Sequence, residues 1–252
     1  MIISEIKAEA RKTLEGLWWK AALLILVFVL ASFVLGLIQR IPVLGALISM
    51  VLSVPLSYGL LSAFIKLRKD RVVAYDSIFK DAFSNFGRAW FVSLHTLLKV
   101  LPWVLLLIAG IAVFVFSMFS KSLLTVGVLV YLATLVVFVV KVYGYVAATY
   151  IAIDRPDLTP KQAVEESSIV MEGNKWKFFC LSLSFIGWAI LAALTVFLLG
   201  IGYLFLLPYI QVSMVIFYES LGGKPETSTV NTNPEPVENP VSTEDTNPIQ
   251  EN

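Results

Sequence analysis

Long apolar runs alternate along the chain with short segments in which charged and apolar residues share the period of a helix. Six runs are long enough to cross a bilayer, and they lie at 17–38, 43–65, 89–119, 123–153, 178–199 and 203–218. The run 178–199 has 22 residues and no charge, which makes about 33 Å of helix against a hydrocarbon layer of roughly 30 Å. We therefore predict an all-α polytopic membrane protein whose six transmembrane helices form three hairpins.

An amphipathic segment precedes each hairpin. The first has apolar residues at helical spacing, with charged residues between them: Ile3, Ile6, Ala10, Leu14 and Leu17. The second, residues 75–90, repeats the spacing with Ile78, Phe79, Phe83 and Trp90 among its apolar positions. Helices of this kind lie flat on a membrane surface. We expect all three at the cytoplasmic face.

The third amphipathic segment carries start and stop signals. Thr159, Pro160 and Gln162 fit the N-cap, the first helical residue and the N3 partner of a capping box. Gly173 then tolerates the left-handed conformation in which helices end. These signals predict a short helix that stops just before the fifth apolar run.

Pro55 lies inside the second apolar run. Because proline has no N–H, the carbonyl one turn earlier loses its helical partner. Within a membrane that carbonyl needs another donor, either a serine hydroxyl or a group on a neighbouring helix.

The composition leaves no room for a soluble domain of useful size. Of the 252 residues, 58% are hydrophobic and 15% are charged, and the mean hydropathy is +0.83. The single cysteine, Cys180, excludes an intramolecular disulfide and a thiolate metal cluster.

The distribution of charge predicts the orientation. Fifteen Lys and Arg residues fall on the side of the expected spans that holds both termini, against only Arg40 and Lys121 on the other side. The positive-inside rule then places both termini of a multi-pass cell-membrane protein in the cytoplasm. We divide the chain into a six-helix membrane domain, 1–221, and an acidic tail, 222–252, which is too polar to fold. The alternative for the tail is that it binds a protein partner.

The three hairpins and their preceding helices compare as repeats. Each unit has a glycine followed by Trp with Lys or Arg, then a span, a short turn and a return span, and each return span has a tyrosine at a similar place: Tyr58, Tyr143 and Tyr209. Because every unit starts and ends on the same side, such repeats are parallel. The alternative is that interfacial Trp and Lys recur before any inward-facing span.

Four pieces of the chain also resemble a known family. They are EARKTLEGLWWKAA, PLSYGLLSAFIKLRKD, YIAIDRPDLTPKQAVEESSIVMEGNKWKFFCLSLSFIGW and GIGYLFLLPYIQVSMVIFYESL. They resemble the uncharacterised bacterial integral membrane proteins of domain-of-unknown-function family 975. The resemblance implies a membrane location and a six-helix body, and it implies no activity. The family's Ile-Pro-Gly-Ile turn before the middle return span is missing here, between residues 100 and 140.

No catalytic or cofactor-binding pattern is present. His95 is the only histidine, and there is no Gly-rich phosphate loop, HExxH or GxSxG sequence. Asp154 and Asp157 have two interpretations, as a metal-binding or catalytic pair or as turn and capping residues, and we favour the second. We expect a protein without enzymatic activity, cofactor or nucleic-acid partner.

Three polar residues within membrane depth form the main candidate ligand site. His95 and Lys99 are four residues apart and share a helix face, and Lys141 lies in the next span. Two lysines without an acidic partner suit an anionic group, with a lipid phosphate or carboxylate as the candidate. The alternative is that each lysine snorkels to the interface.

Two classes of function follow. In the first, which we prefer, a non-enzymatic protein organises or contacts other membrane components at the inner leaflet. Its basic run would contact lipid head groups through Lys66, Arg68, Lys69 and Arg71. In the second, a transporter or lipid carrier has three parallel hairpins around a central cavity, with His95, Lys99 and Lys141 binding an anionic group. A polar cavity would favour the carrier, and an apolar, packed axis would favour the organising protein.

Overall fold

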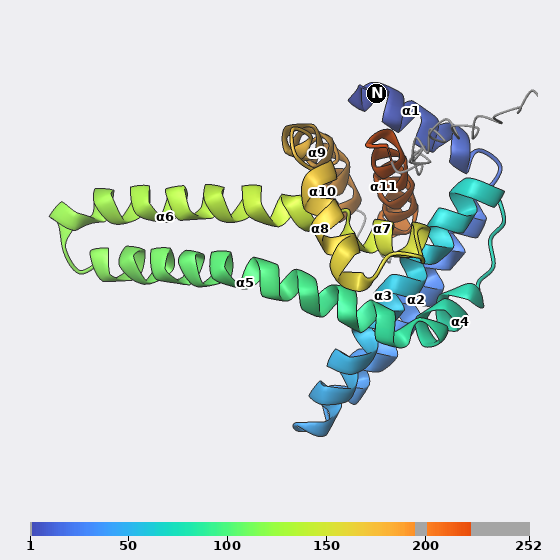
Figure 1. The fold of residues 1–252 in the computed structure, drawn as a ribbon, viewed down its shortest axis with the longest axis horizontal. Coiled ribbons are helices and arrows are strands. Elements are labelled where there is room, and N and C mark those ends of the chain that lie inside the picture. Colours follow the sequence, from blue (N-terminus) through green and yellow to red (C-terminus); the bar gives the residue numbers. More distant parts are fainter. Residues whose placement is uncertain (1, 195–200, 223–252) are drawn as a thin grey trace, which may run out of the picture.

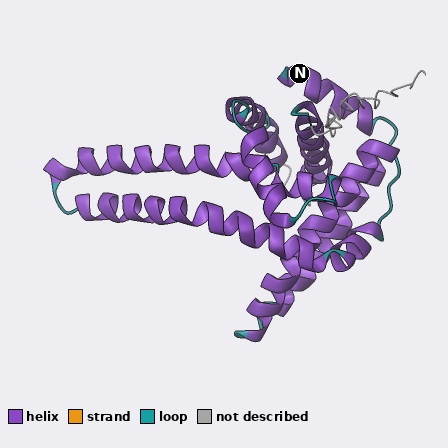
Figure 2. Cartoon of the chain, in the orientation of Figure 1, coloured by secondary structure: helices purple, strands orange, loops and turns teal. Residues whose placement is uncertain are grey.

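The computed structural model describes residues 2–194 and 201–222, and these fold almost entirely into helices, with no strand among them (Figures 1 and 2). In chain order the helices are α1 (Ile3–Leu14), α2 (Trp18–Ile38), α3 (Leu44–Asp70), α4 (Ser77–Ser84), α5 (Phe86–Ser117), α6 (Lys121–Val142), the 3₁₀ turn η1 (Tyr143–Tyr145), α7 (Ala148–Asp154), α8 (Pro160–Val170), α9 (Lys175–Leu183), α10 (Ile186–Leu194) and α11 (Ile201–Ser220).

Six helical stretches of the described residues are long and apolar enough to cross a membrane. They are Trp18–Ile38, Leu44–Asp70, Phe86–Ser117, Ser122–Asp154, Lys175–Leu194 and Ile201–Ser220. The prediction of an all-α protein with six such helices is confirmed. The predicted tail lies outside the described residues, apart from its first residue.

Three units follow one another along the chain, and we call them unit 1 (α1 to α3), unit 2 (α4 to α7) and unit 3 (α8 to α11). The short first helix of each unit packs on the last helix of the preceding unit: α4 on α3, α8 on α7, and α1 on α11. The first long helix of each unit also contacts the end of the preceding unit. Helix α5 contacts α3, α9 contacts the η1 turn, and α2 contacts α11. The three units therefore contact one another in a closed cycle.

The last helices of the units form the centre of the molecule. α3 contacts both α7 and α11, and Phe64, Ile151 and Ile216 of these helices are almost completely buried in one hydrophobic cluster. We call this region the hub; it comprises 58–70, α7 and 209–220. The hub therefore joins all three units through apolar contacts of high sequence separation.

The long helices leave the hub in different directions. Figure 1 shows α5 and α6 side by side, projecting from the rest of the molecule, while α2 and α3 run together along another line. In the most apolar 18-residue stretch of α5, only 11% of the residues are buried. In that of Ser122–Asp154, 6% are buried. Exposed apolar surface on this scale needs a lipid environment. The outer halves of the α2–α3 and α5–α6 hairpins therefore diverge from one another (Figure 1).

Several helices are shorter than their apolar patterns predict. The segment expected as one surface helix, 75–90, divides at Asn85, so that Ile78 is buried in α4 while Trp90 belongs to α5. The fifth span breaks between α9 and α10, where Lys7 Nζ donates to the carbonyl of Ser184 at 3.2 Å. Burial, and then the nearby charge of Arg11, lowers the pKa of the Lys7 ammonium. Tertiary contacts of this kind are invisible to hydrophobic periodicity.

The capping signals of the third unit form as predicted. Thr159 Oγ1 accepts from the backbone N–H of Gln162 at 3.3 Å, and Gln162 Oε1 accepts from the N–H of Thr159 at 2.9 Å. Gly173 and Gly16 have φ values of 76° and 75°, as glycines that follow a helix often do. Gly87, the corresponding glycine of unit 2, lies inside α5 and does not have a positive φ.

The carbonyl of Val51, which Pro55 leaves without a partner inside the helix, is paired by a group on a neighbouring helix. α3 continues through Pro55, and the indole N–H of Trp90 in α5 donates to the carbonyl of Val51 at 3.0 Å. The proline of unit 1 is therefore accommodated by a side chain of unit 2.

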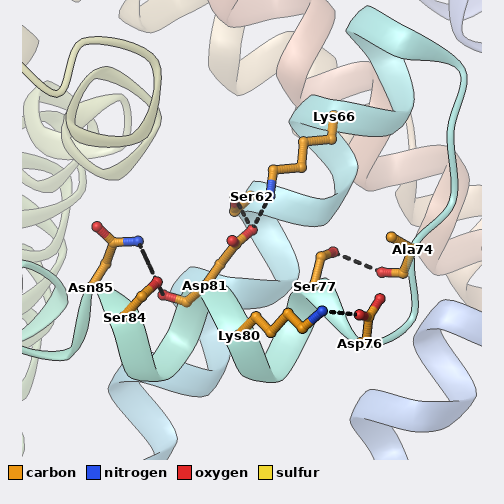
Figure 3. Close-up of polar contacts among 9 residues, drawn as sticks. All are labelled: Ser62, Lys66, Ala74, Asp76, Ser77, Lys80, Asp81, Ser84 and Asn85. Atoms are coloured by element: carbon orange, nitrogen blue, oxygen red, sulfur yellow. Dashed lines mark hydrogen bonds and ion pairs between the residues drawn. The ribbon is translucent and has the colours of Figure 1, made fainter.

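α4 is held on α3 by a small residue and a polar cluster. A Cβ at Gly59 would lie 2.0 Å from the carbonyl oxygen of Ile78. Nearby, the Asp81 carboxylate accepts from Ser62 Oγ at 2.7 Å and from Lys66 Nζ at 2.6 Å (Figure 3). The two backbones thus approach as closely as a glycine allows.

Gly59→Ala is expected to lower the free energy of unfolding by about 1–3 kcal/mol, because α4 must move away from its polar cluster. The matched control is Gly36→Ala in α2, where an added Cβ meets nothing within 4 Å and where alanine favours the helix. Both variants are measured by unfolding in mixed micelles. A Gly59→Ala protein as stable as the parent would contradict the close approach.

Candidate functional site

Arg68 joins three helices at the hub. Its Nε donates to Glu219 of α11 at 3.1 Å, its Nη1 donates to Thr13 of α1 at 3.0 Å, and its Nη2 pairs with Glu9. All of these side chains are at least partly buried. The guanidinium therefore acts as a link between units 1 and 3.

Asp154 is the matching link between all three units. Its side chain is only 9% exposed, and it pairs with Lys69 of α3 while accepting a hydrogen bond from the Tyr218 hydroxyl of α11 at 3.2 Å. Asp157 lies on the surface. Because both oxygens of Asp154 are engaged by neighbouring units, the geometry favours the structural interpretation of this pair of acids.

Arg88 binds the loop that follows α7 through backbone carbonyls. Its Nε donates to Ala152 at 2.9 Å, and its two other nitrogens donate to Pro156 at 3.2 Å, Arg155 at 3.0 Å and Leu158 at 2.8 Å. The carbonyl end of α7 carries a partial negative charge that suits a cation. The sequence marked Arg88 only as the basic residue of the repeated pattern and gave no sign of these contacts, because backbone carbonyls carry no side-chain signal.

The basic run predicted to contact lipid head groups is used within the protein. Lys66 pairs with Asp81, Arg68 and Lys69 make the hub contacts described above, and Arg71 Nη2 donates to the carbonyl of Glu15 at 3.0 Å. Lys66 and Lys69 still expose about half of each side chain. Contact with lipid head groups stays a prediction.

The three polar residues of the main predicted site do not form one cluster of contacts. His95 Nδ1 lies 2.8 Å from the carbonyl of Phe91 one turn earlier, and Lys141 Nζ lies 4.6 Å from the centre of the Trp103 ring. Lys99 is exposed and makes no hydrogen bond or ion pair with the described residues. Anion binding at these residues stays a prediction, and none of them lines the cavity described next.

An open cavity of about 470 Å³, with both polar and apolar walls, lies where the units meet. It is lined from α2, α3, α5, α7, α11 and the residues before α7, and its walls hold no charged side chain. The polar lining residues are Ser53, Ser57, Tyr58, Ser93, Thr149, Tyr150 and Gln211. All three units therefore contribute hydroxyl or amide groups to one space.

A second cavity continues the first along α2 and α3. It measures about 320 Å³ and shares Phe28, Ser53 and Ser57 with the first. It extends to Gln39 at the turn after α2, and its remaining walls are mostly apolar, apart from Ser32 and Ser49. The two cavities adjoin one another, and both have polar as well as apolar walls.

Comparison with known families decides the classification. A profile described as "Protein of unknown function (DUF975)" matches residues 1–224. The chain belongs to this family. No curated protein and no solved structure matches it. Membership in DUF975 brings no activity with it, so the site of this DUF975 chain has to be interpreted from its geometry.

Four polar side chains of the cavity are free to bind a ligand. The hydroxyls of Ser53, Ser57 and Tyr58 donate to backbone carbonyls. The other four make no hydrogen bond to the described residues: Ser93, Thr149, Tyr150 and Gln211. They lie on α5, α7 and α11, which adjoin only after folding. In the sequence, the available signal for these residues was their polarity within apolar runs.

Proposed function

We propose that this protein is a non-enzymatic, multi-pass protein of the cell membrane that binds and carries a small molecule or lipid head group in the cavity between its units. The observation that carries the proposal is that all three units contribute polar groups to one uncharged cavity. The proposal keeps the central cavity of the carrier alternative, but it places the binding site at other residues than His95, Lys99 and Lys141. The excess of basic residues beside both termini supports a cytoplasmic position for the hub.

The unpaired polar groups of the cavity support a binding role. Ser93, Thr149 and Gln211 make no hydrogen bond to the described residues, and their polar atoms are accessible from the cavity. Polar groups between apolar helices are stabilised when they are hydrogen-bonded. A ligand or water would supply the missing hydrogen bonds.

The chemistry of the lining supports binding without catalysis. The cavity walls hold no carboxylate, histidine, cysteine or lysine, and these are the usual acids, bases and nucleophiles of enzymes. A hydroxyl becomes a nucleophile only beside a general base. The lining of this cavity offers hydrogen bonds alone.

A membrane-organising role is the second candidate, and the projecting α5 and α6 favour it (Figure 1). Their packing relies on close contacts inside the pair, since a Cβ at Gly110 would lie 2.1 Å from Thr134 Oγ1. The outer faces, which include Leu105 and Val136, stay exposed. Lipids or other membrane proteins would cover those faces.

Native mass spectrometry tests the proposed function. The protein released from phosphatidylcholine nanodiscs after expression is expected to retain one additional small molecule or lipid. Ser93→Leu, which places an apolar side chain in the cavity, is expected to abolish that retention without lowering thermal stability. Thr96→Val, on the same helix but outside the lining of both cavities, is the control. Equal retention by parent and Ser93→Leu would refute a role for this cavity.

A further inference from the structure

We infer that the cavity accepts an uncharged, hydroxyl-bearing group, such as the polyol head of an amphiphile, in preference to a phosphate or carboxylate. The inference rests on the proposed function and specifies its ligand. It assigns the binding contacts to Ser93, Thr149, Tyr150 and Gln211.

The surroundings of the cavity disfavour an anion. No Lys, Arg or His lines it. Basic residues nearby are engaged within the protein: Arg68 with two carboxylates, Lys69 with Asp154, and Arg88 with four carbonyls, one of which it shares with the lining residue Tyr58. An anion in the cavity would find no lysine, arginine or histidine side chain in the walls to pair with. A neutral group meets no such cost.

The free side chains can both donate hydrogen bonds to ligand hydroxyls and accept hydrogen bonds from them. Ser93, Thr149 and Tyr150 each offer one donor and an acceptor, and the Gln211 amide offers two donors and a carbonyl oxygen. Hydroxyl groups likewise both donate and accept, so a polyol can pair with all four side chains. A site built from such groups rejects analogues that leave them unpaired.

The size and shape of the space suit a head group with an attached chain. A cavity of about 470 Å³ falls within the range of roughly 300–1,000 Å³ that small-molecule sites occupy. The second cavity begins at Phe28, Ser53 and Ser57, and its walls combine the apolar side chains of Leu35, Met50 and Leu56 with the polar ones of Ser32, Gln39 and Ser49. An alkyl chain would lie there with the polyol in the first cavity. The same head chemistry is found in a free sugar and in a glycolipid-like amphiphile, and we expect the amphiphile to bind more tightly.

Three probes separate these possibilities. The full chain in phosphatidylcholine nanodiscs is titrated with octyl glucoside below its micellar concentration, with glucose, and with octyl sulfate, and bound probe is measured by equilibrium dialysis against empty nanodiscs. Octyl glucoside is expected to bind saturably and at least about tenfold more tightly than octyl sulfate. Glucose that bound as tightly as octyl glucoside would identify a free polyol as the ligand and overturn the expectation of an amphiphile.

Near-isosteric variants locate the site. Gln211→Leu and Thr149→Val are each expected to weaken octyl glucoside binding by about tenfold, while Thr96→Val leaves it unchanged. Both cavity variants remove unpaired polar groups, so their thermal stability should equal or exceed that of the parent.

The outcomes distinguish the ligand class from the function. Octyl sulfate that bound more tightly than octyl glucoside, with binding lost in Ser93→Leu, would overturn the neutral ligand and leave the proposed function intact. Failure of every probe to bind saturably, together with no retained molecule in native mass spectra, would overturn both. Octyl glucoside binding that both cavity variants leave unchanged would overturn the assignment of the site.

Discussion

Arg88→Met is expected to lower the free energy of unfolding by about 3–4 kcal/mol, one of the two largest effects that the structure predicts. The substitution removes four hydrogen bonds from a charged donor to backbone carbonyls, and bonds of this kind contribute more than neutral ones. The carbonyl of Ala152 retains only the longer hydrogen bond from Tyr58, at 3.4 Å. Chemical unfolding in mixed micelles measures the loss.

Two further variants test the cause of that loss. Arg88→Lys keeps the charge but has no planar fork, so it should recover less than half of the lost stability. Arg40→Met, at the exposed turn after α2, removes an arginine without such contacts and should change stability by less than about 0.5 kcal/mol. If Arg88→Lys proved as stable as the parent, charge alone would account for the effect and the geometry of the fork would be unimportant.

Trp90→Phe is expected to cost about 2–4 kcal/mol because it leaves the carbonyl of Val51 without a donor. Pro55 cannot supply its own N–H, and a carbonyl unpaired among lipid-facing helices is costly. Phenylalanine keeps most of the apolar contact, so the lost hydrogen bond dominates the change.

A double-mutant cycle isolates this hydrogen bond. Pro55→Ala restores the backbone N–H that pairs with the carbonyl of Val51 within α3. In that background Trp90→Phe should cost less than about 1 kcal/mol, which leaves a coupling energy of about 1–3 kcal/mol between the two positions. Additive effects of the two substitutions would contradict the pairing, whatever their individual sizes.

Local signals in the sequence predicted much of the secondary structure. The capping box at Thr159 and Gln162 and the stop at Gly173 appear as expected, because each depends on residues within one or two turns. The unmet carbonyl near Pro55 was also predictable, since the missing N–H is a property of proline itself. The donor to this carbonyl, Trp90, lies on another helix. The sequence predicted only that the donor would be a serine hydroxyl or a group on a neighbouring helix.

Predictions about the site depend on contacts between residues that lie far apart in the sequence. Charge drew attention to Lys66, Arg68 and Lys69, which the folded chain pairs with acids from other helices. The cavity instead uses Thr149 and Gln211, two uncharged residues far apart in the sequence. Their polarity alone gave no reason to place them in one space.

Hydrophobic length is a property of a single segment, and it was enough to determine six long apolar helices. The family followed from four stretches of the sequence itself. The closed order of the three units, the divergence of α5 and α6 from the hub, and the uncharged cavity were decided only by the tertiary structure. Each of these depends on which helix faces which. That choice is made by side chains such as Gly59, Arg88 and Asp154, whose partners lie on other helices or in loops and adjoin them only after folding.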